Sequence, residues 1–222
     1  MSTRTPAERC IRTSSTRRGY LRTLAVVNAI GIGWLGWPSV SRAAVDPATV
    51  PESKRMRAGR YLLAAEVPAF IAARGGPAKV LFLDVRTRAE AMYVGTPGGV
   101  DALVPYAEHQ ETMIDWDAKR GSYRLEALPD FLSEVQRRLH QKRLDSDDPL
   151  ILICRSGDRS ARAANWLAQD GFTRVWSVVD GFEGDMGQDG RRSVNGWKNA
   201  GLPWSYQLNR EKMYFPRGLA DD

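Results

Sequence analysis

The sequence predicts an α/β fold in which a parallel sheet is flanked by helices on both faces, in three layers. Two continuous apolar runs, 80–85 and 150–153, are typical of strands that are buried on both sides. Segments with the periodicity of amphipathic helices lie between the expected strands. This alternation of strands and helices favours a parallel sheet, because parallel neighbours need a crossover between them.

The first expected strand is short and covers 61–63. Apolar residues at helical spacing then predict a helix over 67–74, which a Gly-Gly-Pro sequence at 75–77 ends. The apolar run 80–85 is the first strand that we expect to be fully buried. A short helix near 88–92 follows it.

The second half of the expected sheet begins with a strand near 102–104. An amphipathic helix over 129–139 then leads to the second buried strand, 150–153. A helix over 160–169 comes next, and a glycine two residues after it is well placed to stop it. The last expected strand covers 175–178.

The first 43 residues resemble an export signal peptide. They contain seven arginines and one acidic residue, an apolar stretch at 24–37 and small residues before the expected cleavage point at Ala43. The apolar stretch is 14 residues long, whereas a membrane span needs about 20, so we expect cleavage rather than a retained anchor. The segment 16–22 is similar to a twin-arginine motif, although general secretory signals also contain adjacent arginines. We therefore expect a periplasmic or otherwise exported protein that meets the membrane only transiently, during export.

Cleavage would leave a mature chain without net charge. The other 179 residues carry 25 basic and 25 acidic side chains. A neutral chain has no long-range attraction for phosphate backbones, which argues against a nucleic-acid partner. We expect a linker of low order at 44–59, one domain at 60–207 and a C-terminal tail at 208–222.

The mature chain would retain one cysteine, Cys154, because Cys10 lies in the leader. A single thiol cannot form an internal disulfide or a cysteine metal cluster, so it is either an inert core side chain or a reactive centre. Its position favours the reactive centre. Cys154 directly follows a buried strand, and the crevice beyond the carboxyl ends of the strands is where open α/β sheets bind their ligands.

The loop from Cys154 to Arg159 has several features that stabilise an anion. The loop contains Gly157, so successive backbone N–H groups can turn inward as an anion-binding nest. The helix that begins near Ser160 adds partial positive charge at its N-terminus. Arg155 and Arg159 add two full charges. Together these groups favour a thiolate over a thiol, and they predict an exposed, nucleophilic cysteine at neutral pH.

This loop resembles the active-site loop of the single-domain rhodanese family of thiosulfate sulfurtransferases. Asp84-Val85-Arg86, the turn at 178–182 and the closing segment at 196–204 are similar to further motifs of that family. The resemblance covers roughly 60–207. The sequence departs from the family pattern at 95–102, where a usual histidine is absent, and at 184–194, which is longer than the usual connection.

The resemblance implies that Cys154 carries sulfur as a persulfide in a ping-pong cycle. The thiolate would take sulfane sulfur from thiosulfate or a similar small anionic donor and pass it to a thiophilic acceptor. Arg155 and Arg86 would attract the donor, and Arg159 would pair with a carboxylate, for which Asp84 is one candidate. The expected substrate-binding residues are Arg86, Arg155, Ser156, Gly157, Asp158, Arg159 and Ser160.

Two alternatives to this enzyme remain. A phosphatase or arsenate reductase on the same scaffold has one residue more between its cysteine and arginine, which is about 3.5 Å of chain. A non-catalytic rhodanese-like module would carry sulfur or bind a protein, with Trp197, Trp204 and Tyr206 as a candidate surface. No cofactor is expected. His109 and His140 lack metal-ligand spacing, so the sequence predicts no metal site.

Overall fold

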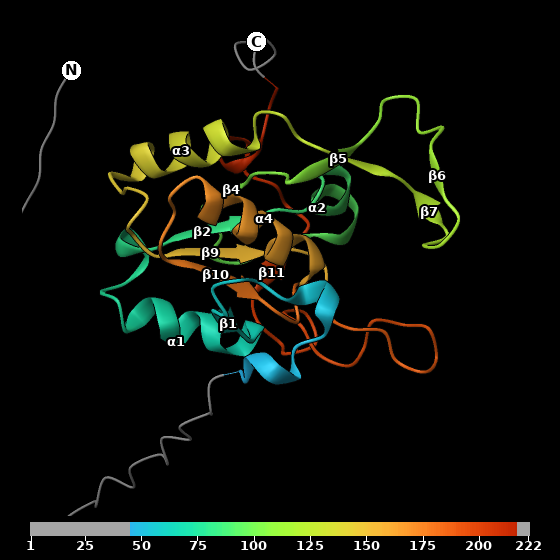
Figure 1. The fold of residues 1–222 in the computed structure, drawn as a ribbon, viewed down its shortest axis with the longest axis horizontal. Helices are drawn as coiled ribbons and strands as arrows, with labels where there is room; N and C mark the ends of the chain where they lie inside the picture. Colours follow the sequence, from blue (N-terminus) through green and yellow to red (C-terminus); the bar gives the residue numbers. More distant parts are fainter. Residues whose placement is uncertain (1–44, 217–222) are drawn as a thin grey trace, which may run out of the picture. The chain divides into compact units, whose positions relative to one another are not determined.

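The computed structural model describes residues 45–216 and contains a central five-stranded sheet in the order β1-β10-β9-β2-β4 (Figure 1). All of its strand pairs are parallel. The predicted α/β class is therefore confirmed. The expected signal peptide at 1–43 lies outside the described residues. The strands are β1 (Tyr61–Leu62), β2 (Leu81–Asp84), β4 (Ala102–Leu103), β9 (Leu150–Ile153) and β10 (Val175–Val178).

Helices cover both faces of the sheet, because successive side chains of each strand point to opposite sides. One apolar cluster joins Leu83 and Leu152 to α3 and α4, and a second joins Phe82 and Ile151 to the start of α1. Figure 1 shows α3 and α4 on one side of the sheet and α1 on the other. The helices are α1 (Val67–Ala72), α2 (Arg88–Val94), α3 (Phe131–Lys142) and α4 (Asp158–Gln169).

Strand β9 lies at the centre of the sheet, between β10 and β2. Each of its four side chains is 0% exposed. Its last residue, Ile153, is in register with Asp84 at the end of β2. Cys154 is the next residue, so it lies at the carboxyl end of the central strand.

Residues 45–59 pack against the domain, so the prediction of a linker of low order is wrong. Val50 and Met56 are 3% and 7% exposed and belong to the core that α4 covers. The Arg57 N–H also donates to Asn165 Oδ1 of α4, over 2.8 Å. The polar composition of this segment concealed two apolar anchors, and their burial is what orders it.

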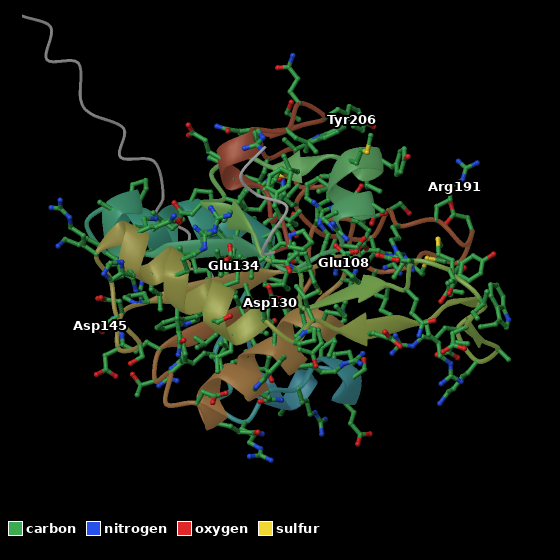
Figure 2. The ribbon with its side chains drawn as sticks, turned by 90° about the horizontal axis from the view of Figure 1, so that it is seen from above. Glu108, Asp130, Glu134, Asp145, Arg191 and Tyr206 are labelled. Carbon is green, nitrogen blue, oxygen red and sulfur yellow. The ribbon has the colours of Figure 1, made fainter. Side chains whose placement is uncertain are left out.

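The expected C-terminal tail is also part of the domain as far as the structure describes it. Tyr214 is 4% exposed, and its hydroxyl donates to both carboxylate oxygens of Asp130 over 3.0 and 2.8 Å. Arg138 of α3 donates to the carbonyls of Glu211 and Met213, each over 2.9 Å. Figure 2 shows Asp130, the residue that accepts the Tyr214 hydroxyl, at the start of α3. The domain therefore extends beyond the expected boundary at 207.

Three short antiparallel pairs, which the sequence analysis did not predict, lie outside the main sheet. Residues 107–127 form an arm, and the arm and the segment 184–194 project on the same side of the fold in both views (Figures 1 and 2). None of the helices within residues 45–216 has the length and hydropathy that a membrane span needs. The pairs are β3 (Thr96–Pro97) with β11 (Trp204–Ser205), β5 (Ala107–His109) with β8 (Leu125–Ala127), and β6 (Trp116–Asp117) with β7 (Ser122–Tyr123).

The packing of residues 45–59 predicts that Met56→Ala lowers the free energy of unfolding by about 2–3 kcal/mol, the usual cost of truncating a buried methionine. Urea unfolding followed by circular dichroism measures this change. Glu52→Ala, at an exposed position of the same segment, serves as the control and should change stability by less than about 0.5 kcal/mol. Equal stability of the two variants would contradict the packing.

Candidate active site

The sulfur of Cys154 lies beneath the loop that the cysteine begins. Its Sγ accepts the Gly157 N–H over 3.2 Å and lies 3.4 Å from Ser160 Oγ. The Cys154 side chain is 1% exposed, so the expectation of an exposed cysteine is wrong. The physical reason is that α4 begins at Asp158, earlier than expected, and its first turn closes over the sulfur.

Gly157 makes the tight turn of this loop. Its φ angle is 103°, in the left-handed region that favours glycine. A Cβ atom here would lie 2.2 Å from the carbonyl oxygen of Val179, a distance that no side chain tolerates. A glycine at this position therefore both forms the turn and directs its own N–H toward the sulfur.

Five other backbone N–H groups belong to the loop and to the first turn of α4. Within residues 45–216 they have no hydrogen-bond acceptor. Unused N–H groups at the start of a helix attract anions, because they carry the positive end of the helix dipole. The residues concerned are Arg155, Ser156, Asp158, Arg159 and Ser160.

The segment after β10 fixes the loop from its outer side. The Phe182 N–H donates to the Cys154 carbonyl over 2.8 Å, and the Glu183 N–H donates to the Arg155 carbonyl over 2.9 Å. A Cβ atom on Gly181 would lie 2.5 Å from the Ser156 nitrogen, so a glycine allows this close approach. Because a trans peptide directs its N–H away from its carbonyl, the N–H groups of Arg155 and Ser156 point to the side opposite this segment.

Arg159 pairs with Glu90 of α2, and not with Asp84, the candidate that the sequence suggested. Its two terminal nitrogens each donate to a Glu90 oxygen over 2.6 Å. Burial alone would raise the pKa of Glu90, but the hydrogen bonds and charge of Arg159 outweigh it and lower that pKa to about 2. Glu90 also accepts the Thr87 N–H as part of a capping box. This Thr-x-x-Glu pattern is the sequence signal that could have identified Glu90.

Arg86 is a structural residue, so its expected role in attracting the donor from solution is wrong. The side chain is 0% exposed and is held by Asp84, over distances of 2.6–3.1 Å, and by the carbonyl of Gly95 at 2.7 Å. Its guanidinium carbon lies 4.1 Å from the ring centroid of Phe182. Arg86 thus joins the end of β2 to the segment after β10 that binds the Cys154 loop.

Arg155 is the cation of the loop that faces solvent. Its side chain is 45% exposed, and its Nε lies 3.8 Å from Glu183 Oε1, which is a loose ion pair. Ser156 is half-buried, and Asp158 accepts a hydrogen bond from the Ser53 hydroxyl over 3.3 Å. Lys54, which the sequence analysis missed, is 6% exposed, lies against Gly157 and pairs with Asp185 over 2.5 Å.

Among residues 45–216 there is no group of three or more histidine, cysteine, aspartate or glutamate side chains that could hold a metal ion. The groups that the described residues bring to the site are the sulfur, the backbone dipoles and the surrounding charges. The described chain brings together every predicted loop residue. It adds Glu90, Lys54 and the turn at 179–184 to them. Arg86 and Asp84 form a buried ion pair with one another instead.

The lowered pKa of Glu90 makes a prediction about stability. A carboxylate whose pKa is lower in the folded state stabilises the fold at pH values above its unfolded pKa of 4.5. This contribution is lost as the pH falls toward the folded-state pKa. Glu90→Gln should therefore lower the free energy of unfolding by about 2 kcal/mol at neutral pH. The difference from wild type should shrink between pH 4.5 and about 2.

Urea unfolding at a series of pH values measures this difference. Glu111→Gln, at an exposed position of the arm, is the control and should match wild type throughout. A Glu90→Gln deficit that stays constant across the acidic range would contradict the ion-pair origin of the effect.

Comparison with known proteins identifies the family. A model of the rhodanese-like domain matches residues 68–186. The RP600 homolog of Rickettsia rickettsii, an uncharacterized protein, is 30% identical over 126 residues, which cover 56% of this chain and 81% of that protein. Thiosulfate sulfurtransferase GlpE of Actinobacillus succinogenes is 34% identical over 87 residues, 39% of this chain and 68% of the relative.

Thiosulfate sulfurtransferase 16 of Arabidopsis thaliana is 30% identical over 122 residues, 55% of this chain and 77% of the relative. Among solved structures, Rv0390 from M. tuberculosis aligns with a TM-score of 0.48 and 29% identity, over 66% of this chain and 97% of that one. The match of the family model, which covers more than half of the sequence, and the relatedness to GlpE agree with the loop around Cys154. This chain belongs to the rhodanese-like domain family.

Proposed function

We propose that this protein is a thiosulfate sulfurtransferase in which Cys154 carries the sulfur. One observation carries this proposal: the sulfur of Cys154, at the end of the central strand, accepts the Gly157 N–H, and five neighbouring N–H groups of the loop and of the first turn of α4 have no backbone acceptor within residues 45–216. Such a cradle suits a group that becomes an anion during the reaction. Relatedness to thiosulfate sulfurtransferases supports the same chemistry.

The reaction would proceed in two displacement steps. The Cys154 thiolate attacks the outer sulfur of thiosulfate, the bond between the two sulfur atoms of the donor breaks, and sulfite leaves with the electron pair. Cys154 then holds the sulfur as a persulfide anion. In the second step a nucleophile such as cyanide attacks the terminal sulfur, thiocyanate leaves, and the cysteine thiolate is restored.

The charges around the loop divide the work in this proposal. Arg155, the exposed cation, would attract the oxygens of the donor. Arg159 is paired with Glu90, so its contribution would be to hold the loop in place. The low exposure of Cys154 favours a donor with a slender terminal sulfur, which can reach into the loop while its charged oxygens stay outside.

We further propose that the protein acts after export, without its leader. This proposal rests on the composition of residues 1–43 and on the twin-arginine-like segment within them. A cleaved leader near Ala43 would leave all the residues of the candidate site in the mature chain.

A second candidate function is a non-catalytic module that carries sulfur or binds a protein. The burial of Cys154 at 1% exposure is the observation that favours it, because a sealed sulfur would not turn over. The two candidates differ in whether Cys154 turns over a small donor and acceptor.

A thiosulfate:cyanide assay distinguishes the two candidates. Wild type should form thiocyanate, and Cys154→Ser should reduce the rate to that without protein. Arg155→Ala should raise KM for thiosulfate about tenfold, the value of one charge-assisted contact, and change kcat less. Arg174→Ala is the control: this exposed arginine precedes β10, at the opposite edge of the sheet. A folded wild type without thiocyanate formation would contradict the enzyme and favour the module.

A further inference from the structure

Two buried serines lie behind the reactive sulfur. Ser160 of α4 and Ser177 of β10 are both 0% exposed, and their hydroxyl oxygens are 2.8 Å apart. Ser160 Oγ lies 3.4 Å from Cys154 Sγ. A chain of hydroxyl groups thus runs from the core of the sheet through the first turn of α4 to the sulfur.

Packing alone does not account for a serine at position 177. Val175 and Val179, two residues before and after it in the sequence, belong to the apolar cluster beneath α3 and α4. The Ser177 hydroxyl makes its one side-chain hydrogen bond within residues 45–216 to Ser160. Burying a hydroxyl costs free energy, and one neutral hydrogen bond only roughly offsets that cost. Alanine at position 177 would therefore stabilise the core about equally well. The serine therefore calls for an explanation beyond stability.

The protons of the two hydroxyls can be assigned along this chain. The Ser160 hydroxyl has one proton and three neighbours: the Gly157 carbonyl at 3.0 Å, Ser177 and the sulfur. The Gly157 carbonyl already accepts the Ala161 N–H over 3.1 Å. The Ser160 hydroxyl can therefore donate its hydrogen bond to the sulfur without leaving that carbonyl unpaired. The Ser177 hydroxyl can in turn donate a hydrogen bond to Ser160 Oγ.

We infer that Ser177 and Ser160 form a two-hydroxyl relay that stabilises the anionic forms of Cys154. Two aligned donors polarise one another, so the hydrogen bond that reaches the sulfur is stronger than that of a lone hydroxyl. A thiol, which carries its own proton, gains less from such donors than a thiolate does. Ser177 is thus a positioning residue that acts through Ser160. The effect on the persulfide rests on the proposed function, whereas the effect on the thiolate does not.

A pH titration of the Cys154 thiolate tests the relay. Ultraviolet absorbance reports the thiolate, and subtracting the matched Cys154→Ser protein isolates Cys154 from Cys10. Ser160→Ala should raise the pH midpoint of this absorbance by about 1 unit and Ser177→Ala by about 0.5 unit, since a direct donor to an anion contributes more than one behind it. Ser177→Thr, which restores the hydroxyl, should return the midpoint toward the wild-type value.

Val175→Ala separates the relay from general packing effects. This residue lies on the same strand and face and is 3% exposed, so its truncation should lower stability without moving the midpoint. Ser177→Ala should retain the thermal stability of wild type. An unchanged midpoint in Ser177→Ala, an equal shift in Val175→Ala, or a folded Ser177→Thr that titrates like Ser177→Ala would each overturn the relay.

The persulfide provides the second readout. After incubation with thiosulfate and removal of the excess, the persulfide of Ser177→Ala should decay several-fold faster than that of wild type, as measured by intact mass. If wild type forms no persulfide but the thiolate midpoint still shifts, the relay stands and the proposed function fails. If the persulfides of wild type and Ser177→Ala decay equally fast, the part of the inference that concerns the persulfide is wrong.

Discussion

The hydrogen bonds between the Cys154 loop and the turn after β10 are the contacts on which the site depends. The N–H groups of Phe182 and Glu183 bind the carbonyls of Cys154 and Arg155, and a peptide unit whose carbonyl faces outward presents its N–H inward. Two glycines, Gly157 and Gly181, allow the two segments to approach to distances that a side chain would prevent. The fold contributes the position, because the central strand β9 delivers the cysteine at the edge of the sheet.

The electrostatics of the site come mainly from dipoles, although the loop contains two arginines. Glu90 neutralises Arg159 and holds it against α2. This arginine therefore fixes the loop in place more than it adds to the positive electrostatic potential at the sulfur. Arg155 keeps a loose partner and an exposed side chain. The Gly157 N–H on the sulfur and the start of α4 supply these dipoles, and the exposed Arg155 lies in the same loop. Such a site suits a single sulfur atom with a charged remainder outside, which agrees with the short spacing between Cys154 and Arg159.

The sequence predicted the parts of the fold whose signal is local. Strand 150–153 and the helix after Cys154 follow from apolar runs, helical periodicity and a glycine stop. Properties set by tertiary packing could not be predicted. Arg86 appears as a free cation in sequence, yet burial against Asp84 and Phe182 removes it from solvent. Residues 45–59 appear polar because Val50 and Met56 are isolated in the sequence. Ser177 lies within an apolar strand, and only the approach of α4 gives its hydroxyl a partner.

We propose that the buried sulfur of Cys154 accepts and retains a sulfur atom. The most direct test is peptide mass spectrometry of the full chain after incubation with thiosulfate and removal of the excess. We expect the peptide that contains Cys154 to gain the mass of one sulfur atom, a reducing agent to remove it, and the corresponding peptide of Cys154→Ser to gain nothing. An unmodified Cys154 peptide in folded protein, or a gain that persists in Cys154→Ser, would contradict it.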